Sequence, residues 1–219
     1  MELMSGDRRM ERISIIDYGR GNILSVRRAF ESQGAKIEFV STSQEIMKAK
    51  KLVLPGVGAF KDGVEELYKR DLVRGIQAYC KEGKPFLGIC LGMQMMLGES
   101  EEFGLTKGLG LIPGRVVRIK NISVEGKEQK VPHVGWNELY YTRSVEGTIL
   151  HGITEKVKMY FVHSYFAVPE DESYRLADTY YGKWRLSAVI KKGNCYGTQF
   201  HPEKSGEMGL KIIQNFVKL

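Results

Sequence analysis

Short apolar runs alternate with segments of helical periodicity through residues 12–97, and this alternation is the feature that most restricts the fold. The apolar runs are RISIID (12–17), KIEFV (36–40), KLVLPG (51–56) and PFLGI (85–89). Residues 23–34, which end at a candidate glycine cap, and residues 63–83 have helical spacing. Strands separated by helices form parallel sheets with helices on both faces. We therefore predict an α/β fold with a mostly parallel central sheet flanked by helices.

The second half of the chain has a different pattern. Residues 114–120, 158–168, 185–193 and 195–200 each read as a strand, joined to the next by hairpins or short turns, and residues 206–219 read as a closing helix. We find no internal repeat and no linker. A length of 219 residues suits one domain with a sizeable core. We expect a single domain over residues 11–219, with additional antiparallel strands in its second half and a flexible extension at residues 1–10.

Composition excludes several classes of protein. The net charge of +7 comes from basic residues that are spread along the chain and interleaved with acidic clusters, which is typical of a solvated surface. The alternative is a face for anionic substrates or an acidic partner. No nucleic-acid-binding motif accompanies the charge, and no apolar stretch is long enough to span a membrane. Three cysteines without close spacing argue against a disulfide framework or a zinc site and favour the cytoplasm.

One cysteine stands at a predicted junction between a strand and a helix. Cys90 lies in GICLGMQ (88–94), with Gly88 and Gly92 on either side. Small neighbours permit the tight turn of a nucleophile elbow, and the start of a helix favours the thiolate. The alternative is a buried cysteine acting as a small hydrophobic residue, which is the reading we give to Cys80 and Cys195.

A nucleophilic cysteine needs a base, and one of the four histidines fits that role. His201 ends an apolar run in GTQFHPEKS (197–205), and the proline after it favours an extended conformation. Glu203, two residues further on, would project to the same side and orient the imidazole. Cys90, His201 and Glu203 are therefore a candidate catalytic triad. On its own, the histidine turn is weak support for catalysis.

A third turn could stabilise negative charge. LPGVGAF (54–60) places glycines around Val57, so that its backbone can turn sharply and present N–H groups. Acyl transfer builds charge on a carbonyl oxygen, and fixed N–H donors stabilise it. Val57, Gly58 and the N–H of Leu91, just after the nucleophile, are the candidate oxyanion groups. Without Cys90 this segment would read as an ordinary turn.

In this order, LPGVGAF, GICLGMQ and GTQFHPEKS resemble the oxyanion loop, nucleophile elbow and histidine segment of the class I (triad-type) glutamine amidotransferases. IDYGRGN (16–22), PHVGWN (132–137) and YFVHSY (160–165) narrow the resemblance to one branch of that family. This branch supplies the glutaminase subunits of imidazole glycerol phosphate synthases in histidine biosynthesis. The resemblance runs from residue 12 onward and implies a flavodoxin-like sheet.

The resemblance implies hydrolysis of L-glutamine to glutamate and ammonia, without a cofactor or a metal. Its implied substrate-binding residues are Gly58, Gln94, Glu102, Ser164 and Tyr165. Glu102 would pair with the α-ammonium group, and backbone groups of Ser164 and Tyr165 would contact the carboxylate. Read without the resemblance, Gln94 is an ordinary helix residue and Glu102 one of a solvated acidic run.

The resemblance also implies a partner. Ammonia released into water would be protonated, so a (β/α)₈-barrel cyclase subunit is expected to collect it within a one-to-one heterodimer. Asn22, Trp136 and Lys204 match family positions at the face that docks on that barrel, although packing is an equal explanation for Trp136. The loop around Val57 is a candidate switch that keeps glutaminase activity low until the partner and its ligand bind.

Other readings remain open at this point. A glutaminase subunit of a sister pathway, such as pyridoxal phosphate or purine synthesis, would share the three motifs. A non-catalytic docking subunit would be expected to lack a member of the triad, yet Cys90, His201 and Glu203 are all present. A cysteine peptidase on a similar fold would lack PHVGWN.

Overall fold

The computed structural model describes residues 10–219. Its largest sheet has eight strands, of which five neighbouring strands are parallel. The strand order is β2-β1-β3-β4-β14-β13-β12-β9. The pairs β14–β13, β13–β12 and β12–β9 are antiparallel. The parallel strands are β1 (Arg12–Ile16), β2 (Lys36–Val40), β3 (Leu52–Gly56), β4 (Phe86–Cys90) and β14 (Cys195–Thr198). The antiparallel strands are β13 (Trp184–Lys192), β12 (Arg175–Tyr181) and β9 (Tyr140–Tyr141). The predicted extension falls almost wholly on residues 1–9, which lie outside the described residues.

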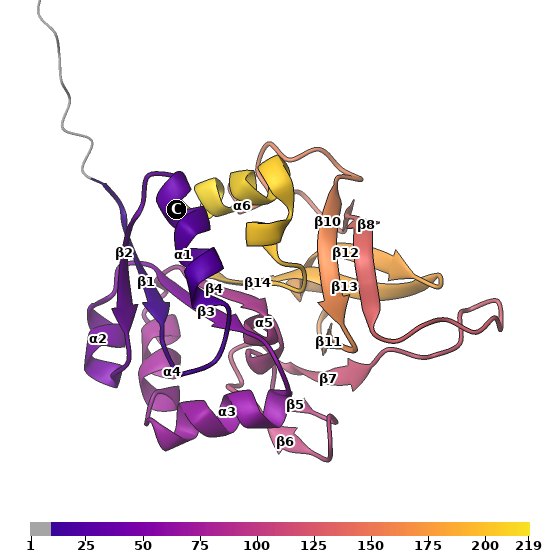
Figure 1. The fold of residues 1–219 in the computed structure, drawn as a ribbon, viewed down its shortest axis with the longest axis horizontal. Coiled ribbons are helices and arrows are strands. Elements are labelled where there is room, and N and C mark those ends of the chain that lie inside the picture. The colour runs from indigo at the N-terminus through magenta and orange to yellow at the C-terminus, as the bar shows by residue number, and fades with distance from the viewer. Residues whose placement is uncertain (1–9) are drawn as a thin grey trace, which may run out of the picture.

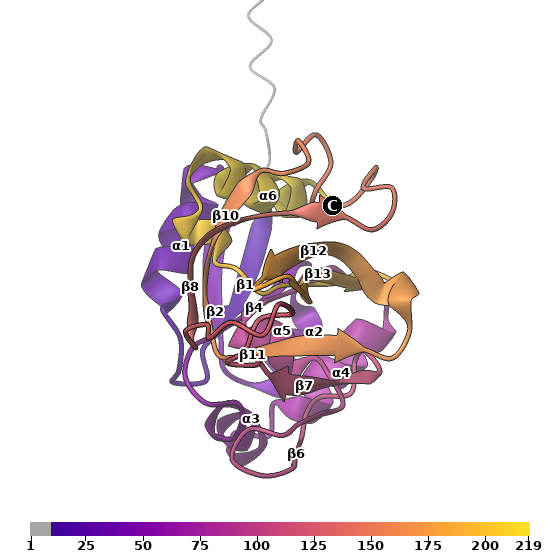
Figure 2. The same cartoon turned by 90° about the vertical axis from the view of Figure 1, so that its right-hand side faces the viewer.

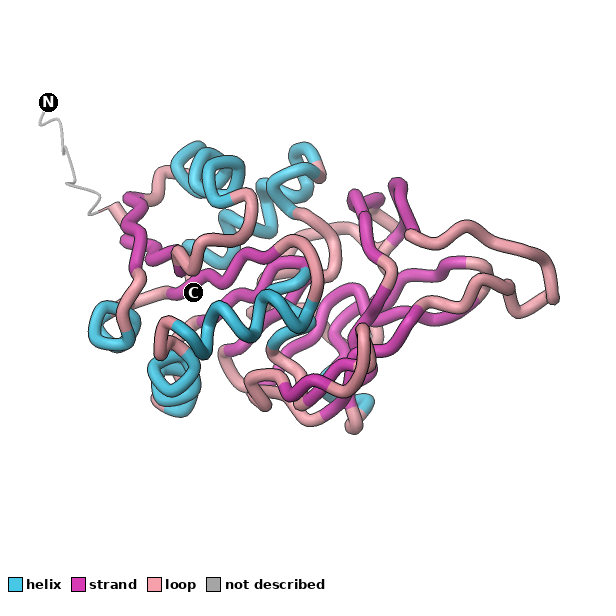
Figure 3. The backbone as a smooth tube through the Cα atoms, turned by 60° about the horizontal axis from the view of Figure 1, so that its bottom comes forward, coloured by secondary structure: helices cyan, strands magenta, loops and turns pink. Residues whose placement is uncertain are grey.

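Helices cover both faces of this sheet (Figures 1 and 3). The helices are α1 (Ile23–Ser32), α2 (Ser43–Lys48), α3 (Phe60–Lys69), α4 (Val73–Lys81), α5 (Leu91–Met95) and α6 (Gly206–Lys218). In Figure 1, α1 and α6 lie above the sheet, and α2, α3 and α4 lie below it. Short 3₁₀ turns occur at η1 (Glu172–Tyr174) and η2 (Pro202–Lys204).

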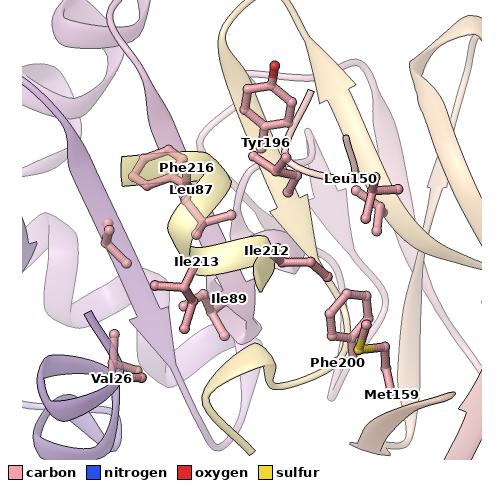
Figure 4. Close-up of a cluster of buried hydrophobic side chains, with 14 of the residues drawn as sticks. Val26, Leu87, Ile89, Leu150, Met159, Tyr196, Phe200, Ile212, Ile213 and Phe216 are labelled. Atoms are coloured by element: carbon pink, nitrogen blue, oxygen red, sulfur yellow. The ribbon is translucent and has the colours of Figure 1, made fainter. Parts of the chain in front are cut away.

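Alternation along each strand explains why both faces are covered. In β1, Ile13 and Ile15 belong to the hydrophobic cluster under α1 and α6, whereas Ile16 belongs to the cluster on the opposite face. Figure 4 shows Ile212, Ile213 and Phe216 of α6 packed against Leu87 and Ile89 of β4. Because strands of a parallel sheet are buried on both sides, they appear in the sequence as continuous apolar runs.

Two small sheets extend the second half of the chain. The first pairs β8 (His133–Glu138) with β10 (Lys158–His163). The second joins β11 (Tyr165–Pro169), β7 (Gly114–Arg118), β5 (Glu99–Ser100) and β6 (Thr106–Lys107). Figure 2 shows β12 and β13 between these two groups of strands. Among the described residues, no helix is long and apolar enough to cross a membrane.

Two of the predicted elements are wrong in extent. The helix predicted over residues 63–83 is two helices, because Asp71 adopts a left-handed φ of 52° between α3 and α4. Aspartate tolerates this conformation better than most residues, so the sequence carries no obvious breaker there. The strand predicted over residues 158–168 is also divided. It breaks at Ser164, and its halves join different sheets.

Candidate active site

The three predicted motifs meet because their strands are neighbours. β4 pairs in parallel with β3 on one side and with β14 on the other, with Cys90 opposite Gly56 and Ile89 opposite Thr198. The loop after β3, the turn after β4 and the segment after β14 therefore leave the same edge of the sheet. This carboxyl edge is where open α/β sheets bind ligands.

Cys90 occupies a strained turn between β4 and α5. Its φ of 54° and ψ of −108° lie outside the regions that most residues adopt. The chain can pass here only because its neighbours lack side chains. A Cβ on Gly92 would lie 1.9 Å from the Leu54 carbonyl oxygen, and one on Gly88 would lie 2.7 Å from the carbonyl carbon of Gly92. The result is the nucleophile elbow that the sequence predicts, with Cys90 only 7% exposed.

Gly92→Ala is expected to destabilise the fold by roughly 3 kcal/mol or more, because backbone rather than a flexible side chain obstructs the added methyl group. Denaturant unfolding measures the change. Gly193→Asn is the control: its added Cβ meets open space, and asparagine tolerates the φ of 57° there. An unchanged unfolding midpoint for Gly92→Ala would show that the elbow is not tightly packed.

His201 and Glu203 form a buried pair beside Cys90. Nδ1 of His201 lies 2.8 Å from Oε1 of Glu203, and the two side chains are 4% and 1% exposed. Burial acts to lower the pKa of His201, but its interactions with Cys90 and Glu203 outweigh burial and raise that pKa to about 10. At neutral pH the imidazole therefore holds its proton when Cys90 is a thiolate. This is the arrangement required of an acid that protonates a leaving group.

A cavity of about 250 Å³ opens in front of this pair. Its lining includes every predicted catalytic, oxyanion and substrate-binding residue except Glu203, which lies behind His201: Val57, Gly58, Cys90, Leu91, Gln94, Glu102, Ser164, Tyr165 and His201. Two larger cavities lie elsewhere, one beside Pro113 and Val168 and one beside Cys80 and Cys195, and neither contains the triad. The 250 Å³ cavity is therefore the candidate active site.

The family described as "Glutamine amidotransferase class-I" matches residues 14–219. The chain belongs to this family.

Similar proteins indicate the branch of the family to which the chain belongs. The chain is 54% identical to the "Imidazole glycerol phosphate synthase subunit HisH 1" of Legionella pneumophila (strain Lens), over 96% of this chain and 100% of that protein. It is 47% identical to the "Imidazole glycerol phosphate synthase subunit HisH" of Geobacillus sp. (strain WCH70), over 94% of this chain and 96% of that one. These identities place the amidotransferase in the HisH branch and confirm the resemblance inferred from the motifs.

A solved structure shares the fold. "PurLQS from Thermotoga maritima" aligns with a TM-score of 0.74, covering 95% of this chain and 98% of that one, at 20% identity. At that identity the likeness concerns the fold alone. It confirms the predicted α/β class, with a mostly parallel central sheet and additional antiparallel strands.

Two buried glutamines connect the pocket of the amidotransferase to its nucleophile. Nε2 of Gln94 donates to the Tyr165 carbonyl oxygen at 2.8 Å and to Oε1 of Gln199 at 3.1 Å. Nε2 of Gln199 in turn donates to the Cys90 sulfur at 3.8 Å. Both amide hydrogens of Gln94 are thus used, so the group it can offer to a ligand is its carbonyl oxygen, an acceptor. Gln199 is not among the predicted site residues, although it is a polar residue within a run that reads as a buried strand.

Glu102 reaches the pocket from the loop after β5. Its Oε2 accepts the backbone N–H of Phe60, at the first residue of α3, at 2.6 Å. The carboxylate is therefore held by α3 while it lines the cavity. The placement fits the predicted contact with an α-ammonium group.

The three predicted interface residues flank the triad. Asn22 caps α1 through a hydrogen bond from the Ser25 N–H at 3.4 Å and lines a small recess beside His201 and Glu203. Trp136 lies on β8 and is 53% exposed, with the Tyr160 ring 6.0 Å away between centroids. Lys204 is exposed immediately after Glu203. Both α1 and β10, the partner strand of β8, pack against η2, which carries Glu203 and Lys204.

The other two cysteines lie away from the pocket but close to each other. Hydrogen bonding to Cys195 and burial raise the pKa of Cys80. Neither thiol contacts the triad, which fits the structural roles predicted for them. Within residues 10–219, no group of three or more histidine, cysteine, aspartate or glutamate side chains could hold a metal ion.

Proposed function

We propose that this amidotransferase hydrolyses L-glutamine to glutamate and ammonia and passes the ammonia to a cyclase subunit that makes imidazole glycerol phosphate and an aminoimidazole carboxamide ribotide in histidine biosynthesis. The observation that carries the proposal is the single cavity in which Cys90, His201, Gln94 and Glu102 meet. Membership of the HisH branch favours this reading over a sister pathway. The complete triad disfavours a non-catalytic docking subunit.

The reaction follows from the geometry in two steps. The Cys90 thiolate attacks the side-chain amide carbon, and the backbone N–H groups around Val57, Gly58 and Leu91 stabilise the oxyanion. His201, oriented by Glu203, gives its proton to the amide nitrogen as the C–N bond breaks, so that the nitrogen leaves as ammonia and a glutamyl thioester remains. His201 then takes a proton from water as the water attacks the thioester. The thioester C–S bond then breaks, which restores the Cys90 thiolate beside protonated His201, and the new carboxyl group loses its proton to solvent to give glutamate.

Substrate recognition uses the rest of the cavity. We propose that the Glu102 carboxylate pairs with the α-ammonium group of glutamine, while Gly58 lines the cleft and the backbone at Ser164 and Tyr165 binds the α-carboxylate. Glu102→Gln is expected to raise KM by about tenfold or more with a smaller effect on kcat, because a charge-assisted contact becomes neutral. The glutamine side chain retains an oxygen for the Phe60 N–H, so folding is preserved. Steady-state kinetics in the complex measure the change, and an unaltered KM would remove Glu102 from the ammonium site.

The proposed partner is a (β/α)₈-barrel cyclase bound in a one-to-one heterodimer. The relatives are named as synthase subunits, and Asn22, the exposed Trp136 and Lys204 lie around η2, beside the triad. Gly58 has a left-handed φ of 98°, so the peptides around Val57 can reorient at low cost. We propose that partner and ligand binding reorient them and raise glutaminase activity. Residues 11–219 would act as one domain, in the cytoplasm, where thiols remain reduced.

The test mixes the protein with a histidine-pathway cyclase subunit and measures glutamate release with and without the cyclase's phosphoribulosyl formimino nucleotide substrate. We expect a heterodimer, slow release from the isolated protein and much faster release from the loaded complex. A cyclase that neither binds the protein nor stimulates glutamate release would contradict the proposal. A free subunit as fast as the loaded complex would contradict only the coupling between the subunits.

A further inference from the structure

Two histidines outside the triad are buried against the candidate active site. His133 on β8 and His163 on β10 are cross-strand partners, 0% and 6% exposed. His163 also lines the cavity that holds Cys90. The reaction as described above uses neither of them. Buried polar rings at such a position require hydrogen-bond partners, and those partners indicate their role.

The contacts of His163 fix the position of its proton. Burial lowers the pKa of both histidines, that of His163 to about 3, with the nearby His133 as a further cause. Each ring is therefore neutral at pH 7 and has one N–H. Nδ1 of His163 lies 2.9 Å from the Tyr165 carbonyl oxygen, which can only accept, so the proton of His163 is on Nδ1. Its Nε2 is then an acceptor, and it lies 3.0 Å from Nδ1 of His133.

Tyr165 is the point at which this row of hydrogen bonds reaches the pocket. Its carbonyl oxygen accepts from both His163 and Gln94. The preceding carbonyl, that of Ser164, accepts the N–H of Ile119 at 2.8 Å. The peptides on both sides of the Tyr165 Cα are therefore held. Hydrogen-bonded and non-hydrogen-bonded pairs alternate along an antiparallel ladder. Because Ile119 donates to Ser164, the next pair, Arg118 and Tyr165, is a non-hydrogen-bonded one, and the Tyr165 N–H points away from β7.

His133 is itself fixed by its surroundings. Its ring stacks between Tyr181, at 4.2 Å between centroids, and Phe161, at 5.1 Å. Oδ1 of Asn137 lies 2.8 Å from Nε2 of His133, and Nδ2 of Asn137 donates to the Tyr180 carbonyl oxygen at 2.9 Å. His133 therefore has an acceptor beside each ring nitrogen and one N–H to share between them. Both His133 and Asn137 belong to β8, the strand that also carries the exposed Trp136. The row thus begins on a strand at the proposed docking face and ends at the backbone of the pocket.

We propose that His133 and His163 are positioning residues that hold the Tyr165 carbonyl and thereby fix the Tyr165 N–H as a donor to the α-carboxylate of the amino-acid substrate. The inference rests on the proposed function and deepens it, because it names the groups that orient the carboxylate subsite. His163 acts on the substrate through the Tyr165 backbone rather than through its own ring. His133 acts through His163.

Paired variants separate this role from simple packing. His163→Phe and His133→Phe keep an aromatic ring and remove the donor, whereas His163→Asn and His133→Asn place an amide nitrogen near the position of Nδ1. In the complex with the cyclase, we expect both phenylalanine variants to raise KM for glutamine about tenfold while kcat changes less than about threefold. His163→Asn should return KM to within about threefold of the wild type.

A second measurement reports on binding without catalysis. In a Cys90→Ala background, calorimetric titration with glutamine should show the same tenfold weakening for His163→Phe and its recovery for His163→Asn. Thermal unfolding of each variant establishes that it is folded. A wild-type KM in folded His163→Phe, or equal losses in His163→Phe and His163→Asn, would overturn the inference while leaving the proposed function intact. A wild-type complex that neither binds nor hydrolyses glutamine would instead remove the proposed function, and this inference with it.

Discussion

Cys90→Ala is expected to lower glutamine-dependent glutamate release by roughly 10⁴-fold or more, because no thioester can form without the sulfur. The other two thiols cannot substitute for it. Cys80 and Cys195 line a different cavity, and neither reaches the pocket that holds His201. Release of glutamate by the complex with the cyclase, at saturating nucleotide substrate, measures the loss.

Two controls make this result specific. The complex that contains Cys90→Ala should still form imidazole glycerol phosphate when ammonium chloride replaces glutamine at high pH, because free ammonia bypasses the glutaminase step. Cys80→Ser should leave glutamate release within about threefold of the wild type. A Cys90→Ala complex that retains more than about 1% of glutamine-dependent activity would show that another nucleophile carries the reaction.

The central sheet was predictable because its strands are short, continuous and apolar. KIEFV was predicted as a strand, and β2 has the same bounds, Lys36–Val40. The prediction failed where local signals were ambiguous. α2 was not predicted, although Thr42 and Glu45 form a capping box before it, because a helix of six residues shows little periodicity. The division between β10 and β11 depends on which sheet each half joins, and a single run of apolar residues does not encode that choice.

The part of the candidate site that could be predicted is the part whose reactive residues lie in short sequence motifs. The turns that hold Cys90 and His201 each combine a reactive side chain with glycine or proline, which marks a sharp change in chain direction. Gln199, His133 and His163 act through partners far along the chain. Gln199 meets Gln94 across 105 residues, and His163 meets His133 across 30. Such contacts depend on strand order and register, so although PHVGWN and YFVHSY contain the two histidines, the local sequence does not indicate what these residues contact.

His201→Asn is expected to lower glutamate release by roughly 10³-fold or more, because the complex loses both the acid for ammonia departure and the base for thioester hydrolysis. Asparagine retains a nitrogen near the position of Nδ1, so the contact with Glu203 persists and the loss reports on proton transfer. Steady-state release in the cyclase complex measures it. A His201→Asn complex with activity near that of the wild type would place the general acid elsewhere.

Glu203→Gln tests what raises the pKa of the same imidazole, through the pH dependence of kcat and of unfolding free energy. The pKa of His201 is raised from 6.5 to about 10, so its contribution to folding stability is fully present below about pH 6.5 and is lost as the pH rises through about 10. The acidic form of His201 protonates the leaving amide nitrogen, so kcat should fall on the alkaline side as that form is lost. Glu203 is one of the two groups that raise the pKa, and its neutralisation should move this alkaline limb to lower pH and flatten the matching decline in unfolding free energy. An alkaline limb that stays in place in Glu203→Gln would mean that this carboxylate orients the ring without stabilising its charge.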